Sequence, residues 1–320
     1  MTKQVLGINF SGSAEQWEAR KRNSNVWIAA GRADDARLLI DDLAPVQALL
    51  GDAEPFNRLA EALSDIDGFA AIAAPFSAPR EYAASVPVLW AQASGLPHEG
   101  RPFGRGADLV ELLSPGAGRH GLKVYRACET LWRQRGLNTP CALWSGPGGG
   151  ASAAVACMTL LLVRGGPVWP LRPGGEGAVL VEACPSAQLF TWGLQPGGYS
   201  GAKGKAAAAR ARILTALVAD HGLVVSEPQA ALCRDNANAL DAVVSAYAAK
   251  TMADGRHPRQ LPAAARSEGW IVVDESPSAR GPLLAATAEH RVHRQFDALM
   301  EAMAGDPDEA DSAGATNAPA

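Results

Sequence analysis

The first third of the chain contains continuous apolar runs separated by short polar segments, and this pattern predicts strands. The run over 5–10 ends at Ser11 and has the length of a buried strand. Two further apolar runs are joined by the polar turn 31–36, which contains one glycine, as a hairpin link should. Apolar residues at helical spacing then predict a helix, and one more apolar run ends before Pro75. The predicted order is strand 5–10, strand 25–30, strand 37–43, helix 55–63 and strand 68–74.

This order of elements favours an α/β fold with a mixed sheet. The short polar turn 31–36 allows only antiparallel pairing of the second and third strands, and with the first strand they fit an antiparallel meander. The helix at 55–63 is long enough to cross over the sheet, which would place the fourth strand parallel to the first.

The remainder of the chain predicts mainly helices around one long irregular segment. That segment, 94–140, is rich in Gly, Pro and Arg, and we interpret it as an insertion or lid. Further helices are predicted at 81–93, 124–135, 151–163, 201–220, 228–233, 238–252 and 283–303, and further strands at 178–183 and 269–273. We therefore expect one domain over 1–275 with an insertion at about 94–140, a helical extension over 276–304 and a disordered tail over 305–320.

Composition narrows the classes of protein that the chain can belong to. Of its 320 residues, 48% are hydrophobic, which is enough for a sizeable core, and the net charge of −4 argues against coating nucleic acid by bulk charge. The five cysteines include no C-x-x-C pair, so a zinc ribbon or a disulfide framework is not expected. The apolar run 151–163 is too short to span a bilayer, and the N-terminal run is too short for a signal peptide. We expect a cytoplasmic protein with reduced thiols and no membrane partner.

Four sequence pieces, in order, carry a resemblance to a known family. They are Gly-Ile-Asn-Phe-Ser-Gly at 7–12, Ala-Ala-Pro-Phe-Ser-Ala-Pro at 73–79, Val-Glu-Ala-Cys-Pro-Ser-Ala at 181–187, and Ala-Leu-Asp-Ala at 239–242 leading into Ala-Tyr-Ala-Ala at 246–249. The chain resembles the proteins of the domain of unknown function 429 family, which are predicted ribonuclease H-like nucleases. The resemblance spans roughly residues 3–273, breaks down over 94–140, and implies a ribonuclease H-like fold.

The resemblance also implies an acidic site that this chain retains only in part. Family members usually carry Asp on the first and fourth strands, Glu on a later strand and Asp on a later helix, and these acids would hold two Mg²⁺ or Mn²⁺ ions about 3.5–4 Å apart for phosphodiester hydrolysis. Here the first two positions are Asn9 and Ala73, and the last two are Glu182 and Asp241. By resemblance Glu182, Asp241 and Asn9 are the candidate catalytic residues, and Glu182 and Asp241 are the candidate metal ligands. All four positions should then line one cleft.

Each of these residues also has a structural interpretation. Glu182, a carboxylate on an apolar strand, needs either a cation or a salt bridge to an arginine. Asp241 would favour the first turn of a helix through the helix dipole. Asn9 could be paired with neighbouring backbone groups.

Four further residues are candidates for binding the phosphate groups of a substrate. Ser11 and Ser77 follow the two altered strand positions, where hydroxyl groups can line a phosphate site but more often cap turns. Lys203 and Lys205 begin a helix with no acid before Asp220, and they would either contact phosphates or form a solvated face.

Two functions from different classes remain open. One is a divergent metal-dependent nuclease or phosphohydrolase acting on nucleic acid or a nucleotide-like substrate with Mg²⁺ or Mn²⁺. The other is a catalytically impaired pseudo-enzyme that uses the same cleft as a binding module. The absence of Asp at positions 9 and 73 favours the second, and the retained Glu182 and Asp241 favour the first.

Overall fold

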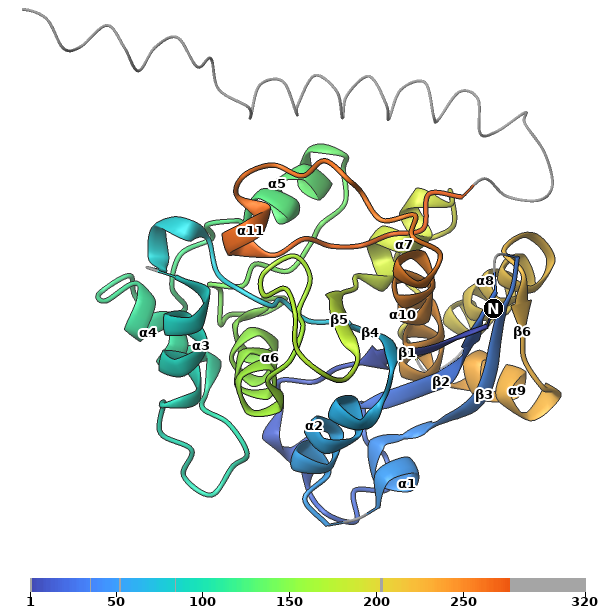
Figure 1. Ribbon diagram of the computed structural model, residues 1–320, viewed down its shortest axis with the longest axis horizontal. Coiled ribbons are helices and arrows are strands. Elements are labelled where there is room, and N and C mark those ends of the chain that lie inside the picture. The colour runs from blue at the N-terminus through green and yellow to red at the C-terminus, as the bar shows by residue number, and fades with distance from the viewer. Residues whose placement is uncertain (1, 35, 52, 84, 202–203, 277–320) are drawn as a thin grey trace, which may run out of the picture.

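The computed structural model describes residues 2–34, 36–51, 53–83, 85–201 and 204–276, and they form one mixed sheet flanked by helices (Figure 1). The strand order is β5-β4-β1-β2-β3-β6. β1 pairs antiparallel with β2 and parallel with β4, while β2 and β3 are antiparallel. The predicted meander and crossover are confirmed, and the α/β architecture is consistent with a ribonuclease H-like fold. The strands are β1 (Lys3–Asn9), β2 (Trp27–Ala33), β3 (Leu38–Pro45), β4 (Gly68–Ile72), β5 (Val179–Glu182) and β6 (Leu223–Val224).

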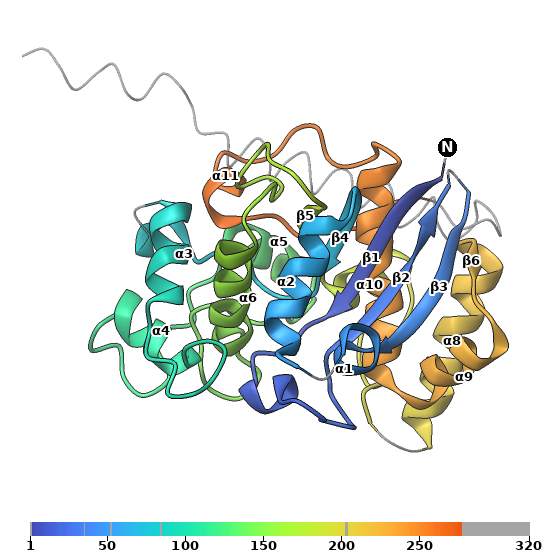
Figure 2. The ribbon, with the colours of Figure 1, turned by 60° about the horizontal axis from the view of Figure 1, so that its bottom comes forward.

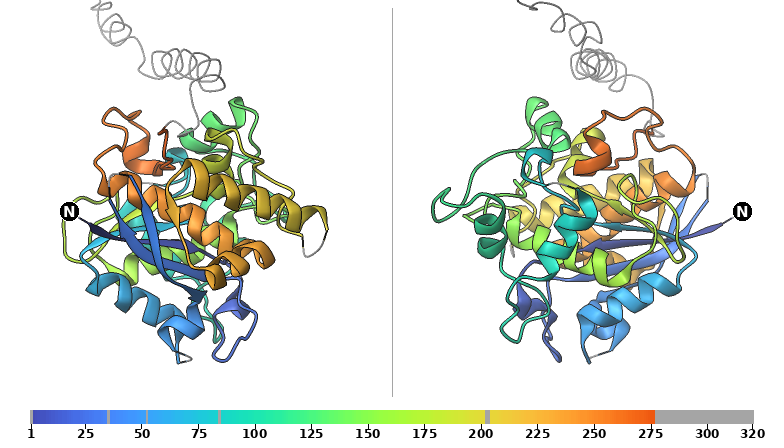
Figure 3. Two further views of the ribbon diagram at one scale, coloured as in Figure 1. Left: turned by 90° about the vertical axis from the view of Figure 1, so that its right-hand side faces the viewer. Right: turned by 60° about the vertical axis from the view of Figure 1, so that its left-hand side comes forward.

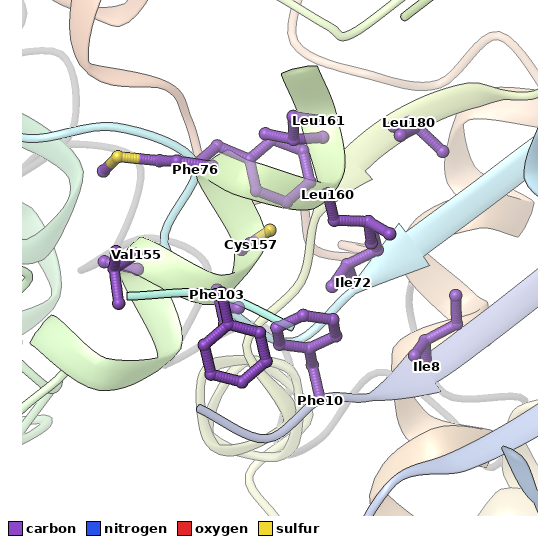
Figure 4. Packing of buried hydrophobic residues seen from close by; sticks show 14 of the residues in the cluster. Ile8, Phe10, Ile72, Phe76, Phe103, Val155, Cys157, Leu160, Leu161 and Leu180 are labelled. Carbon is purple, nitrogen blue, oxygen red and sulfur yellow. The ribbon is translucent and has the colours of Figure 1, made fainter. Parts of the chain in front are cut away.

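Helices cover both faces of this sheet (Figures 2 and 3). Alternate strand residues point to opposite faces, so Leu6 and Ile8 pack in one core cluster and Val5 packs in the other. Figure 4 shows the first cluster, where Ile8, Ile72 and Leu180 from three strands approach apolar residues of α6. On that side lie α2 (Pro55–Asp65), α3 (Val86–Ser94) and α6 (Ala151–Arg164), and on the other lie α8 (Lys205–Asp220), α9 (Glu227–Asp235) and α10 (Ala237–Ala253).

The close approach of α10 to β1 depends on a glycine. A Cβ atom on Gly7 would lie 2.1 Å from the carbonyl oxygen of Ala242 and 2.3 Å from the backbone nitrogen of Ala246. Because no other residue fits this space, β1 and the alanine-rich α10 pack backbone against backbone. This packing holds Asp241 of α10 beside the end of β1.

The segment 94–140 is more ordered than its composition predicts. It contains α4 (Gly106–Leu113), which the sequence analysis missed, and α5 (Ala127–Gln134), which it predicted at 124–135. Apolar residues of α5 pack with Ala265, Trp270 and Ile271 in a third core cluster. The insertion is therefore joined to the C-terminal part of the domain and does not project from it.

The late strand predicted at 269–273 is wrong as a strand, because only one bridge forms, between Ile271 and Glu182. A single backbone hydrogen bond of 2.9 Å joins Val272 to Glu182. The ladder ends there because the chain enters α7 (Pro185–Thr191), and the backbone N–H of Asp274 donates instead to Gln188 Oε1 at 2.7 Å.

The other predicted helices that fall within the described residues are confirmed, some of them with shifted starts, and several short elements were not predicted. The helix predicted at 81–93 begins only at Val86, and the one predicted at 201–220 begins at Lys205. The unpredicted elements are α1 (Val46–Leu50), α7 (Pro185–Thr191), α11 (Ala265–Glu268), β6 and two short 3₁₀ helices (Ala14–Trp17 and Arg80–Tyr82).

The C-terminal predictions cannot be compared with the structure. The helix at 283–303, and nearly all of the extension 276–304 and the tail 305–320, lie outside the described residues. Among the residues that are described, no helix has the length and apolar character needed to cross a membrane.

Candidate functional site

A cleft of about 220 Å³ opens where β1, β4 and β5 end. Carboxyl ends of parallel strands are the usual location of ligand sites in open α/β sheets. Asn9 ends β1, Ala73 directly follows β4, Glu182 ends β5, and Asp241 reaches the cleft from α10. The structure thus brings together the four positions that the family resemblance singled out.

Glu182 is held by an arginine from the insertion. Glu182 is buried, with only 2% of its surface exposed. Arg126 donates two hydrogen bonds to the carboxylate, from Nη2 to Oε1 at 2.6 Å and from Nη1 to Oε2 at 2.7 Å. The backbone N–H of Phe76 adds a third, to Oε2, at 3.2 Å. The salt-bridge interpretation of Glu182 is therefore the one observed, with both carboxylate oxygens occupied.

Arg126 is the centre of a buried charged cluster. Its Nε donates to Glu129 Oε1 at 2.8 Å, and Nη1 also donates to the backbone oxygen of Glu268 at 2.9 Å. Burial would lower the pKa of Arg126, but the acidic groups beside it outweigh burial and hold the pKa above its ordinary value. Burial raises the pKa of Glu129, and Arg126 opposes that rise. One guanidinium thus compensates two buried carboxyl groups.

Glu268 fixes the position from which Arg126 enters the cleft. One of its carboxylate oxygens accepts from the backbone N–H of Ala127 at 2.6 Å, and the other accepts from that of Arg80 at 2.9 Å. Arg126 is the residue that caps the N-terminus of α5, and its own backbone N–H donates to Glu129 at 3.0 Å. The segment 94–140 is therefore held to the floor of the cleft by these hydrogen bonds. Such anchoring favours its interpretation as an insertion over that as a lid, because a lid must be able to move.

Asp241 forms the other side of the cleft with a tyrosine. The hydroxyl group of Tyr199 donates to Asp241 Oδ1 at 2.8 Å. Burial raises the pKa of Asp241 to about 7, although the hydrogen bond from Tyr199 lowers it in part. Burial, followed by the nearby Asp241, raises the pKa of Tyr199. Asp241 is the fifth residue of α10, so the first-turn interpretation does not describe it.

Asn9 is paired within the protein. Its Nδ2 donates to the backbone oxygen of Asn25 at 2.7 Å and to Asn238 Oδ1 at 3.1 Å. Asn238 in turn donates to Asn25 Oδ1 at 3.1 Å. An aspartate at position 9 has no proton to donate to these two oxygens, so the asparagine fits its surroundings better than the family's acid.

The candidate phosphate-binding residues do not meet at the cleft. Ser11 Oγ accepts from the backbone of Ser13 at 3.2 Å within a turn, and Ser77 is buried and donates to the backbone oxygen of Ser267 at 2.7 Å. Lys205 is exposed at the start of α8 and does not line the cleft, and Lys203 lies outside the described residues. The residues that sequence reasoning missed are Arg126 and Tyr199.

The donor set does not fit a two-metal centre. Both oxygens of Glu182 already accept from Arg126, the nitrogen of Asn9 is turned toward protein oxygens, and Ala73 offers no ligand. A divalent ion at Glu182 would lie beside a guanidinium group, which repels it. Among the described residues, no group of three or more His, Cys, Asp or Glu side chains is arranged to hold a metal ion.

Comparison with known families gives one match. A family model described as "Protein of unknown function (DUF429)" matches residues 153–267. This part of the chain is similar to the DUF429 family. The matched part contains Glu182, Tyr199 and Asp241, but it does not reach Asn9, Ala73 or Arg126. No curated protein and no solved structure matches the chain.

The raised pKa of Asp241 predicts a pH-dependent effect of Asp241→Asn. Since folding raises the pKa from 3.8 to about 7, the charged form destabilises the folded state. This destabilisation begins above the pKa of Asp241 in the unfolded chain, grows as the pH rises, and is complete above its pKa in the folded chain. The free energy of unfolding of the variant should therefore rise relative to that of the wild type by ~2 kcal/mol between about pH 5 and pH 8. This is less than the full pKa shift would give, because solvent in the cleft screens the charge of the carboxylate.

Urea denaturation at a series of pH values measures this difference. Asparagine keeps an oxygen that can accept from Tyr199, so the variant removes mainly the charge. Asp65→Asn, at an exposed position at the end of α2, is the matched control and should show no such trend. Parallel stability curves for the wild type and Asp241→Asn would mean that Asp241 has an ordinary pKa.

Proposed function

We propose that the protein is a ribonuclease H-like pseudo-enzyme of the DUF429 family, whose cleft binds a ligand without metal-dependent hydrolysis. The observation that supports this function is the pair of hydrogen bonds that Arg126 donates to the carboxylate of Glu182 inside the cleft. A guanidinium group supplies positive charge at the place where an active member of this superfamily would hold a metal ion. It cannot generate a metal-bound hydroxide, which is the nucleophile of the metal-assisted route.

The cleft favours a small polar group over a phosphate. Its volume of about 220 Å³ lies below the roughly 300–1,000 Å³ of drug-sized ligand pockets. Among the described residues that line it, Arg126 is the only cation, and that charge is compensated by Glu182 and Glu129. Asn9, Tyr199 and Asp241 offer hydrogen-bonding groups instead. A nucleotide-like partner would accordingly enter the cleft through an uncharged part such as its base. We also propose that the protein is cytoplasmic.

Metal titration together with a cleavage assay tests this function. In calorimetry, Mg²⁺ and Mn²⁺ should give no saturable binding to the full chain, and single-stranded and double-stranded DNA and RNA should remain intact. The Asp241→Asn variant is the control for contaminating nuclease, because it changes the cleft and leaves the purification unchanged. Metal binding together with cleavage that Asp241→Asn abolishes would establish the alternative, a metal-dependent phosphodiester hydrolase.

A further inference from the structure

A second pocket, of about 320 Å³, lies between the insertion and the C-terminal part of the domain. One wall is α5, which contributes Leu131, Trp132 and Arg135. The other walls are the segments 256–260 and 270–275, which follow α10 and α11 (Figure 1). Ile271 lines both this pocket and the cleft, so the two hollows are neighbours. Its volume is within the range of about 300–1,000 Å³ that small-molecule sites occupy.

The pocket wall is predominantly cationic. It contains three guanidinium groups, from Arg135, Arg256 and Arg259, and one carboxylate, from Glu275. Arg256 pairs with Asp254 and lies 3.7 Å from Asp274, and neither aspartate lines the pocket. The two aspartates therefore contact Arg256 from outside the pocket, and its guanidinium group remains part of the pocket wall.

Two of the arginines that line the pocket are suited to an anionic ligand. Arg259 is exposed and makes no ion pair with any residue that the structure describes. Burial lowers the pKa of Arg135, and the carboxylate of Glu275 offsets this only in part. Guanidinium groups bind phosphate and carboxylate through paired hydrogen bonds, so both are suited to an anionic ligand.

The rest of the wall is apolar and partly aromatic. Trp132 and Trp270 line it together with Leu131, Ile271 and Val273. The guanidinium of Arg135 lies 5.0 Å from the ring centre of Trp132, an arrangement in which the ring and the cation share one surface. Such a wall suits a flat apolar ring, which the tryptophans and the guanidinium plane contact on its faces or edges.

We propose that this pocket binds a small organic anion in which a phosphate or carboxylate group is attached to a flat ring system. Nucleoside monophosphates and aromatic carboxylic acids share this chemistry. The anionic group contacts Arg259 and Arg135, and the ring packs on the side of Trp132 and Trp270. This function is separate from that of the cleft and does not depend on it.

Calorimetric titration of the full chain with adenosine monophosphate and with indole-3-acetate tests the proposal and separates the two sources of ligand. Saturable binding of either supports it, and adenosine or inorganic phosphate alone should bind at least about tenfold more weakly, since each supplies half of the contacts. Arg259→Gln should weaken binding about tenfold through loss of a charge-assisted hydrogen bond. Arg259→Lys should recover part of that loss, because the charge returns without the planar fork.

Two control variants locate the bound anion. Arg266→Gln removes an equal charge from an exposed position on α11 outside the pocket, and it should change affinity less than about twofold. Asp241→Asn alters the cleft and should leave affinity unchanged. Absence of binding by both probes, an equal loss in Arg259→Gln and Arg266→Gln, or a loss in Asp241→Asn with none in Arg259→Gln would each overturn the proposal.

Discussion

Arg126→Ala should lower the free energy of unfolding by about 3–5 kcal/mol, the usual cost of leaving buried partners of an ion pair uncompensated. Arg126 is 1% exposed, and it is the cation shared by Glu129 and Glu182. Alanine would leave both carboxyl groups buried without a counter-charge, and it would also remove the hydrogen bond to Glu268. Chemical denaturation followed by circular dichroism near neutral pH measures the loss.

Two comparisons show whether the loss comes from the charges. Arg133→Ala, on the exposed side of the same helix, removes a guanidinium that contacts Tyr125 and Asn138 and should cost no more than about 1 kcal/mol. Burial raises the pKa of Glu129, and Arg126→Ala removes the group that opposes this rise, so the charged form of Glu129 destabilises the folded variant. The deficit should therefore shrink as the pH falls and Glu129 becomes protonated. A deficit that does not change with pH would assign the loss to packing instead.

The sheet could be predicted from the sequence because its strands are specified locally. The runs that became β1, β4 and β5 are continuous and apolar, as strands buried on both faces must be. The helix that became α2 shows its buried face in the spacing of Phe56, Leu59 and Leu63. These signals need no knowledge of distant contacts, so the order of elements was sufficient to give the meander and the crossover.

Elements that depend on tertiary contacts were missed or overstated. The eight residues of α4 begin with a glycine and are too few to display a clear helical period. The predicted strand at 269–273 has the apolar character of a strand, but its pairing depends on β5, which ends before a ladder can form. α4 packs against α6, and the segment 269–273 pairs with β5, so in both cases the deciding partner is far away along the chain.

The cleft positions could be located from the sequence, but their chemistry could not. The pairing of Glu182 depends on Arg126, which is 56 residues away in a segment with no recognisable motif. The role of Asn9 depends on Asn238, which is 229 residues away. The pKa of Asp241 depends on burial that only the folded chain creates. Residue types at matching positions therefore identified a site, whereas the contacts of those residues determine what the site can do.

The changes at the cleft form a consistent set. Asn9 donates to Asn238 where an acid would need a metal ion, and Ala73 removes a second ligand. Arg126 then supplies the positive charge that the remaining Glu182 requires. A metal site with these two acids restored would still contain the guanidinium, so two substitutions alone should be insufficient to recreate it.

Recreating metal binding should therefore require Asn9→Asp and Ala73→Asp together with Arg126→Gln. In the triple variant four acidic positions face one cleft, and Mg²⁺ would compensate charges that otherwise destabilise the fold. At about a hundredfold excess over its Kd, Mg²⁺ should stabilise the triple variant by about 2.7 kcal/mol, whereas the double variant with Arg126 intact should show no such gain. Thermal unfolding with and without Mg²⁺ measures both. An equal stabilisation of the double variant by Mg²⁺ would mean that the ion displaces Arg126 from Glu182. Glu182 would then be able to bind a metal ion in the natural chain as well.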